Sequence, residues 1–174
     1  FVKKNIQEVV REGIKAIPQE SSYYKCMTDV IKWYDQNPTD WKATWKLIQD
    51  KWGMAENCPE GMDAALNIDA KINSAYVIMG LLYGNGDYTQ TIHVSTRCGQ
   101  DSDCNPSTAA GILGTLIGYK NIPLAWKNCL PPVENQNFAH TSISLKKAYD
   151  LSFKHALEVI RRNGGKVSQI GRAH

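Results

Sequence analysis

The chain has 174 residues, of which 43% are hydrophobic and 21% are charged, and its formal net charge is +3. This length and composition indicate one globular domain with a sizeable core and exclude a disordered chain. The Lys and Arg residues are spread along the sequence, so no nucleic-acid partner is expected. No apolar run approaches the roughly 20 residues of a membrane span, so no membrane partner is expected either.

Two amphipathic helices are predicted at the start of the chain. Apolar residues recur at helical spacing over residues 2–17, and Pro18 ends that helix. Ser21 or Ser22 is expected to cap the second helix, which is broken at Asn37-Pro38. The sequence therefore opens with helical structure.

A third helix, capped by Thr39, is predicted to carry a stripe of large apolar side chains. The members of this stripe fall at steps of four, three and four residues: Trp41, Trp45, Ile48 and Trp52. A stripe of tryptophans can bind a sugar or a base, but it is more often part of a core. We therefore expect this stripe to be buried.

The central part of the sequence predicts a loop followed by two helices. Residues 53–71 lack clean periodicity and are expected to form a loop with a short helical turn at 62–66. Residues 72–83 are apolar nearly all round, which is typical of a central, buried helix. Asp87 is expected to cap the next helix, which ends near Cys98.

A helix rich in small residues is predicted over residues 106–119. Asn105 is a suitable N-cap, and Pro106 occupies the favoured first helical position. Each glycine inside this helix costs about 1 kcal/mol relative to alanine. We therefore expect its glycines to allow close approach of neighbouring helices.

The remaining sequence predicts a short helix at 122–129, a loop at 130–141 and a last helix at 144–162. A short strand within residues 135–145 is the one departure from helical structure that we consider. The fold class expected is therefore all-α, a multi-helix orthogonal bundle that forms a single helical domain over residues 1–174.

The five cysteines are widely spread along the chain: Cys26, Cys58, Cys98, Cys104 and Cys129. An odd number at such spacing argues against a disulfide framework. A zinc site formed by His93, Cys98 and Cys104 would match no common ligand spacing. We therefore expect free, buried thiols.

Two carboxylates, Asp101 and Asp103, lie in a short loop immediately before a predicted helix. Side chains at positions i and i+2 of such a loop can converge on a hard cation such as Mg²⁺. Alternatively, acidic residues near a helix start simply complement its dipole. An EF-hand is excluded, because its sixth position is Pro106 instead of glycine and its twelfth is Ile112 instead of Glu.

The same region carries a resemblance to a known family. The run from Gly99 to Gly118, with its Gly-Gln-Asp-Ser-Asp start and small-residue helix, resembles the C-terminal half of the ADP-ribosylglycohydrolase family, where the signature is Gly-Gly-Asp-Thr-Asp. Weaker similarities precede and follow this run: Ala16-Ile17-Pro18, Asn73-Ser-Ala-Tyr-Val, Gly86 to Ile92, and Ile122 to Trp126. The resemblance extends over about residues 1 to 130.

The resemblance implies an all-helical fold with a cleft that holds two Mg²⁺ ions. An ADP-ribosylated protein or a small-molecule ADP-ribose conjugate would bind there, and water would cleave the N- or O-glycosidic bond at C1 of the ribose. Asp101 and Asp103 match the family's C-terminal metal ligands and are the implied catalytic residues, with Asp103 the better candidate for bridging both ions. Gly99, Gln100 and Asn105 are the candidate substrate-binding residues, although Gln100 and Asn105 could instead orient the aspartates or cap the helix.

The sequence departs from the family pattern in two respects. Cys104 stands where the family usually has Thr or Ser, and soft sulfur is a poor ligand for magnesium. The N-terminal Thr-Asp-Asp-type motif, which holds the other metal ligands, and the Gly-Asp-Ala-type start do not occur in this sequence. We therefore expect a C-terminal fragment that is inactive alone, with a non-catalytic nucleotide-sugar binding or structural protein as the alternative function.

Overall fold

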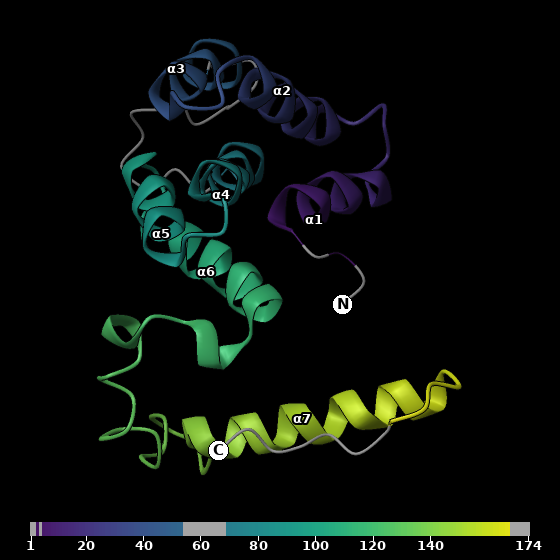
Figure 1. Ribbon diagram of the computed structural model, residues 1–174, viewed down its shortest axis with the longest axis vertical. Coiled ribbons are helices and arrows are strands. Elements are labelled where there is room, and N and C mark those ends of the chain that lie inside the picture. The colour runs from purple at the N-terminus through teal and green to yellow at the C-terminus, as the bar shows by residue number, and fades with distance from the viewer. Residues whose placement is uncertain (1–2, 4, 54–68, 168–174) are drawn as a thin grey trace. The chain divides into compact units, whose positions relative to one another are not determined.

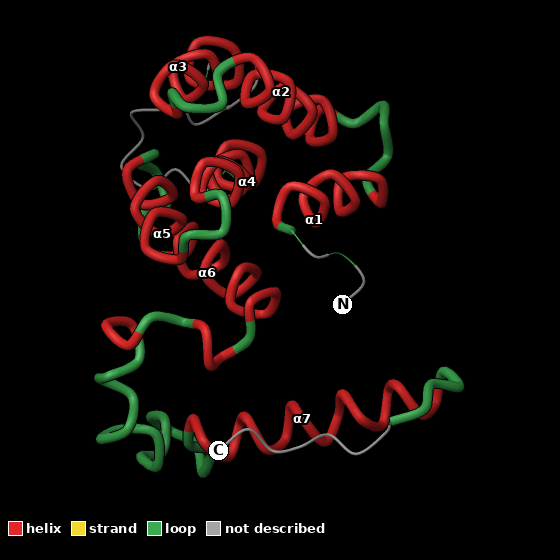
Figure 2. The backbone as a smooth tube through the Cα atoms, viewed as in Figure 1, coloured by secondary structure: helices red, strands yellow, loops and turns green. Residues whose placement is uncertain are grey.

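The regular structure consists of seven α-helices and three short 3-10 helices in the computed structural model, which describes residues 3, 5–53 and 69–167 (Figures 1 and 2). No strand occurs among these residues, where the single bridge joins Asn137 and Ser144. The all-helical fold is thereby confirmed, whereas the short strand considered within 135–145 is wrong. The chain divides into two compact units, Phe1–Asn121 and Ile122–His174, and the helical turn predicted at 62–66 lies outside the described residues.

The first three helices are α1 (Ile6–Gly13), α2 (Ser22–Gln36) and α3 (Trp41–Trp52). α1 continues into a 3-10 turn, η1 (Ile14–Ala16). Ser21 caps α2 as predicted, because its hydroxyl accepts the Tyr24 N–H at 3.1 Å. Asp40, not Thr39, caps α3, and its carboxylate accepts the Ala43 N–H at 3.0 Å.

Helix α4 (Ala70–Gly84) forms the centre of the first unit and is in contact with α1, α2, α3, α5 and α6 (Figure 1). Its largest fully buried side chains are Ile72, Tyr76, Met79 and Leu82. Asp69 caps its start, and its end is turned by Asn85, whose φ of 47° lies in the left-handed region. The prediction of a central buried helix is confirmed, because apolar residues on all sides of α4 find helical neighbours.

The tryptophan stripe of α3 belongs largely to the core, as predicted. Ile48 and Trp52 are buried, while Trp41 and Trp45 are half-buried against the core. The Trp52 indole donates a hydrogen bond to Asp29 Oδ2 at 2.9 Å, so its one polar atom is satisfied.

Close helix packing occurs between α4 and α5 (Tyr88–Arg97). A Cβ atom added to Gly80 would lie 2.7 Å from Ser95 Cβ, and one added to Gly84 would lie 2.7 Å from Thr91 Cα. By contrast, a Cβ on Gly111 of α6 (Cys104–Ile117) would meet nothing within 4 Å. The expectation that Gly111 allows a neighbouring helix to approach closely is therefore wrong. The close glycine contacts instead join α4, at Gly80 and Gly84, to α5.

This difference predicts opposite effects for two glycine-to-alanine substitutions. Gly84→Ala should lower the free energy of unfolding by about 1–3 kcal/mol, because the new methyl group overlaps the backbone of Thr91. Gly111→Ala, the matched control, should raise it by up to about 1 kcal/mol, because alanine favours the helix and has open space there. Urea unfolding of both variants measures this, and equal effects of the same sign would contradict the assignment.

The second unit is described by itself. Residues 122–129 form only the 3-10 turn η3 (Leu124–Trp126), so the helix predicted there is wrong. The consecutive prolines at 131 and 132 disfavour helical geometry just before them, and two turns are too few to be stable without packing. Helix α7 (Leu145–Arg162) is confirmed, with Ser144 as its N-cap and Gly164, at a φ of +75°, beyond its end.

The described cysteines are free, and they fall into two classes. Cys26 and Cys98 are buried, whereas Cys104 and Cys129 are exposed, so the expectation of buried thiols holds for only two of the four. Burial raises the pKa of both Cys26 and Cys98 from the ordinary value of 9.0 to about 12.

These raised pKa values predict a loss of stability in alkaline solution. Above pH 9.0 the unfolded chain releases the Cys98 proton that the folded protein keeps up to about pH 12, so the free energy of unfolding falls as pH rises through this window. Cys98→Ser should flatten this fall by up to about 1.4 kcal/mol per pH unit, while Cys129→Ser should leave it unchanged. Urea unfolding measured between roughly pH 8 and pH 10.5 tests this prediction. If the free energy of unfolding changed with pH equally in the two variants, the prediction would be contradicted.

Among the described residues, no helix combines the length and the apolar character that crossing a membrane requires.

Candidate metal site

The loop between α5 and α6 is shaped by two consecutive residues with left-handed backbone geometry. Gly99 has a φ of +89° and Gln100 a φ of +58°, a conformation that glycine adopts at little cost and other residues seldom adopt. The start of the loop is fixed from α3, because the Trp45 indole donates to the Cys98 carbonyl at 2.8 Å. The backbone thus turns sharply before the aspartates.

A buried amide of α4 joins the loop to the start of α6. Asn73 Oδ1 accepts the backbone N–H of Asp101 at 3.1 Å and the side-chain amide of Asn105 at 2.8 Å. Its own Nδ2 donates to the Asp69 carbonyl at 3.1 Å, and the residue is only 9% exposed. Asn73 therefore fixes the position of the Asp101 backbone from a rigid helix.

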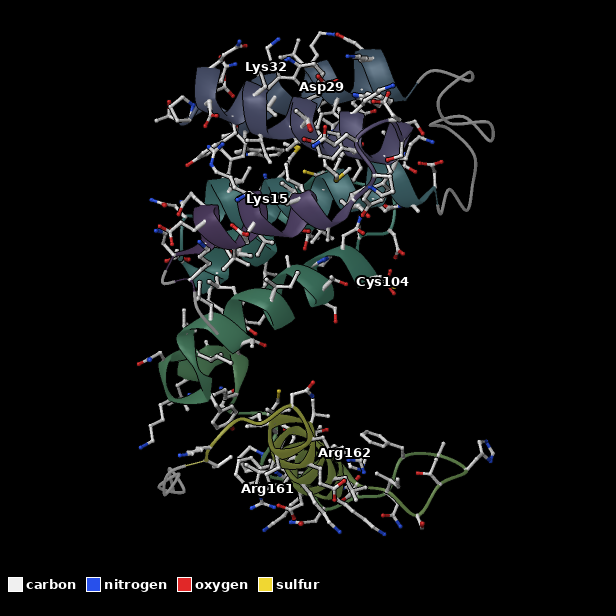
Figure 3. All side chains as sticks on the ribbon, turned by 90° about the vertical axis from the view of Figure 1, so that its right-hand side faces the viewer. Lys15, Asp29, Lys32, Cys104, Arg161 and Arg162 are labelled. Carbon is white, nitrogen blue, oxygen red and sulfur yellow. The ribbon has the colours of Figure 1, made fainter. Side chains whose placement is uncertain are left out.

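Three potential ligand atoms gather at this loop. Oxygen atoms of Asp101 and Asp103 and the Sγ of Cys104 lie within 4.8 Å of one another, with Asp101 half-buried and the other two exposed. Figure 3 labels Cys104, whose side chain lies at the solvent-facing start of α6. The side chains of Asp101, Asp103 and Cys104 therefore lie close together at this loop.

The two aspartates relate differently to the helix start. Asp101 Oδ1 accepts the Cys104 N–H at 3.3 Å, so part of its role is to cap the helix. Asp103 occupies the N-cap position of α6, yet its carboxylate makes no capping hydrogen bond there. Helix capping therefore accounts for Asp101 in part and leaves Asp103 without a capping role.

Electrostatics set the protonation of this cluster. Hydrogen bonding with the Asp103 carboxyl group and then with the Cys104 thiol holds the pKa of Asp101 below its usual range. The same hydrogen bond to Asp101, with the negative charges of both aspartates, raises the pKa of the Cys104 thiol. At neutral pH the Asp101 carboxylate is ionised and the thiol keeps its proton, which gives a hard oxygen donor set. Such a set fits Mg²⁺, whereas a protonated thiol does not.

The other predicted site residues lie close to this cluster along the chain. Gly99 and Gln100 are half-buried in the same loop. Asn105 is buried in the first turn of α6, and its amide is held by Asn73, so the prediction that it is the N-cap is wrong. That role was misassigned because the partner of Asn105 lies on another helix and is not visible locally in the sequence.

Sequence reasoning missed Asn73 as a site residue. It lies within one of the stretches that resemble the family, but the position itself was not singled out. One feature of the sequence could have indicated Asn73: it is an amide residue on a predicted helix that is apolar nearly all round. A polar group buried in such a helix requires hydrogen-bond partners from elsewhere in the fold.

Comparison with known proteins identifies the family of this chain. The model of the ADP-ribosylglycohydrolase family matches residues 2–153, which include the Asp101 loop and every helix of the first unit. No curated protein and no solved structure matches the chain. Since the family match covers well over half of its residues, the chain belongs to the ADP-ribosylglycohydrolase family.

Proposed function

We propose that this chain supplies the C-terminal half of a magnesium site that hydrolyses the N- or O-glycosidic bond between ADP-ribose and a protein side chain or small acceptor. The observation that carries this proposal is the convergence of the Asp101 and Asp103 carboxylates on a loop that Asn73 fixes in place. Family membership supports ADP-ribose conjugates as the class of substrate.

Asp101 and Asp103 are the residues that would hold two Mg²⁺ ions, together with ligands supplied by the rest of the complete protein. When bound, magnesium would orient the ribose hydroxyls and lower the pKa of a coordinated water molecule. The carboxylates stabilise the positive charge that develops at the ribose C1 as its bond to the acceptor breaks, and they help to accept the proton of the attacking water. Gly99 and Gln100, which are half-buried in the same loop, are the residues that we expect to contact the ribose.

A second candidate function is binding of a nucleotide-sugar, or a structural role, without hydrolysis. Cys104 favours it, because a thiol that keeps its proton leaves the site with one fewer ligand than a Thr or Ser hydroxyl would provide. The two candidates make different predictions for turnover, while both allow ADP-ribose to bind.

The deciding experiment measures ADP-ribose release from a modified protein by the complete protein, with and without magnesium. The parent is compared with an Asp101→Asn, Asp103→Asn double variant and with Asp150→Asn, an exposed α7 position, as a matched control. Magnesium-dependent release by the parent and the control, but not by the double variant, is the expected result. A folded parent that releases nothing from arginine-linked, serine-linked or small-molecule conjugates would replace hydrolysis with the second candidate.

A further inference from the structure

The peptide group that enters the left-handed turn is held at both of its polar atoms. Its carbonyl, from Cys98, accepts the indole N–H of Trp45 at 2.8 Å. Its N–H, from Gly99, donates to the Thr96 carbonyl at 3.2 Å. Because a peptide group is planar, hydrogen bonds at both atoms fix the orientation of the plane. The side chain of Trp45 therefore sets, from α3, the direction in which the chain enters the turn.

The peptide group that leaves the turn is held in the same way from α4. Its carbonyl, from Gln100, accepts the Ser102 N–H at 2.9 Å. Its N–H, from Asp101, donates to Asn73 Oδ1 at 3.1 Å. Two helices that are far from the loop in sequence thus each supply one side-chain hydrogen bond, one before the left-handed pair of residues and one after it.

The turn needs such support because one of its two left-handed residues is not glycine. Gln100, at a φ of +58°, adopts a conformation that costs free energy and persists only where the surrounding structure holds it. Rotation of the entering peptide would change the φ of Gly99 and redirect the chain that leads to both aspartates. Cys98 is only 2% exposed, so its carbonyl has little access to water as a replacement for the indole.

We propose that Trp45 is a positioning residue of the Asp101 loop. Its indole N–H holds the entering peptide in place, and the turn then keeps the carboxylates of Asp101 and Asp103 close together. The connection of this loop with magnesium rests on the proposed function, whereas the connection of Trp45 with the loop does not. A simpler account is that the indole only satisfies a carbonyl at the end of α5, which predicts a loss of stability and no effect on the loop.

Trp45→Phe tests the proposal, because it removes the indole N–H and keeps an aromatic ring on α3. The first measurement is hydrogen exchange in the full-length protein without magnesium. The amides of Gly99 and Asp101 should exchange at least about 5-fold faster than in the parent, since the turn is no longer held at its start, while amides in the middle of α6 should not change. Unchanged exchange at both amides would overturn the proposal.

Trp52→Phe is the matched control. It also removes one indole hydrogen bond, but that bond goes to Asp29 Oδ2 of α2, at 2.9 Å, and not to the loop. This variant should leave exchange at Gly99 and Asp101 as it is in the parent. Equal acceleration in the two variants would mean a general loss of stability and would overturn the proposal.

Magnesium titration of the full-length protein, followed by thermal unfolding, is the second measurement. Trp45→Phe should weaken magnesium binding about 3- to 10-fold, because it loosens a group that orients the ligands and removes no ligand, while Trp52→Phe should not change it. Faster exchange with unchanged magnesium affinity would overturn the positioning role. A parent that binds no magnesium would contradict the proposed function, and the exchange measurement would still decide whether Trp45 holds the loop.

Discussion

Replacing Asp103 by Asn should abolish the stabilisation of the full-length protein by magnesium while leaving its stability without magnesium unchanged or slightly raised. Asp103 is exposed and makes no capping hydrogen bond, so the fold loses nothing when its charge is removed. Its carboxylate faces that of Asp101, and removal of one of two neighbouring negative charges relieves repulsion. Activity should fall at least about 100-fold, or ~2.7 kcal/mol of transition-state stabilisation, because the proposed magnesium site would lose one of its ligands.

Thermal unfolding with and without magnesium distinguishes this from the simpler view that Asp103 only complements the dipole of α6. Loss of a favourable dipole interaction would lower stability by about 0.3–1 kcal/mol whether or not magnesium is present. Loss of a metal ligand would instead reduce only the extra stability that magnesium gives to the folded protein. That extra stability grows with the ratio of the free magnesium concentration to its dissociation constant. If Asp103→Asn retained wild-type turnover and the full magnesium effect, the assignment of Asp103 to the metal site would fail.

Local sequence signals predicted most of the helices correctly. Ser21, Asp87 and Ser144 are short polar residues directly before periodic apolar runs, and each caps the helix that follows it. Where two neighbouring residues could both cap, as at Thr39 and Asp40, the local pattern did not distinguish them. Helix existence was therefore more predictable than the exact residue at which a helix begins.

The candidate site was predictable to the extent that its residues are neighbours in sequence. Asp101, Asp103 and Cys104 lie within four positions, so a turn before a helix is enough to bring them together. Asn73 is 28 residues away from Asp101, and their hydrogen bond depends on how α4 packs against α6. Tertiary contacts of this kind also explain why the close glycine contacts were expected on α6 and found between α4 and α5.

Replacing Asn73 by Ala should weaken magnesium binding by the full-length protein roughly 10- to 100-fold, although both aspartates remain. The buried carbonyl oxygen of Asn73 accepts the Asp101 N–H and the Asn105 amide, and the variant leaves both donors without this partner. The free energy of unfolding should fall by about 1–3 kcal/mol, because buried donors are costly to leave unsatisfied. Alanine itself favours the helix, so α4 should remain intact. Magnesium titration followed by thermal unfolding measures both effects.

A purely structural role for Asn73 would lower stability without changing magnesium affinity, so the two measurements must be compared. Hydrogen exchange at the Asp101 amide gives a third readout, since loss of the Asn73 carbonyl should speed exchange there more than in the middle of α6. Ser74→Ala, one position along α4, is the matched control and should change stability by no more than about 0.5 kcal/mol and magnesium affinity not at all. An Asn73→Ala protein that unfolds more easily yet binds magnesium as tightly as its parent would assign Asn73 to the core alone and leave the Asp101 loop to be positioned by its own turn.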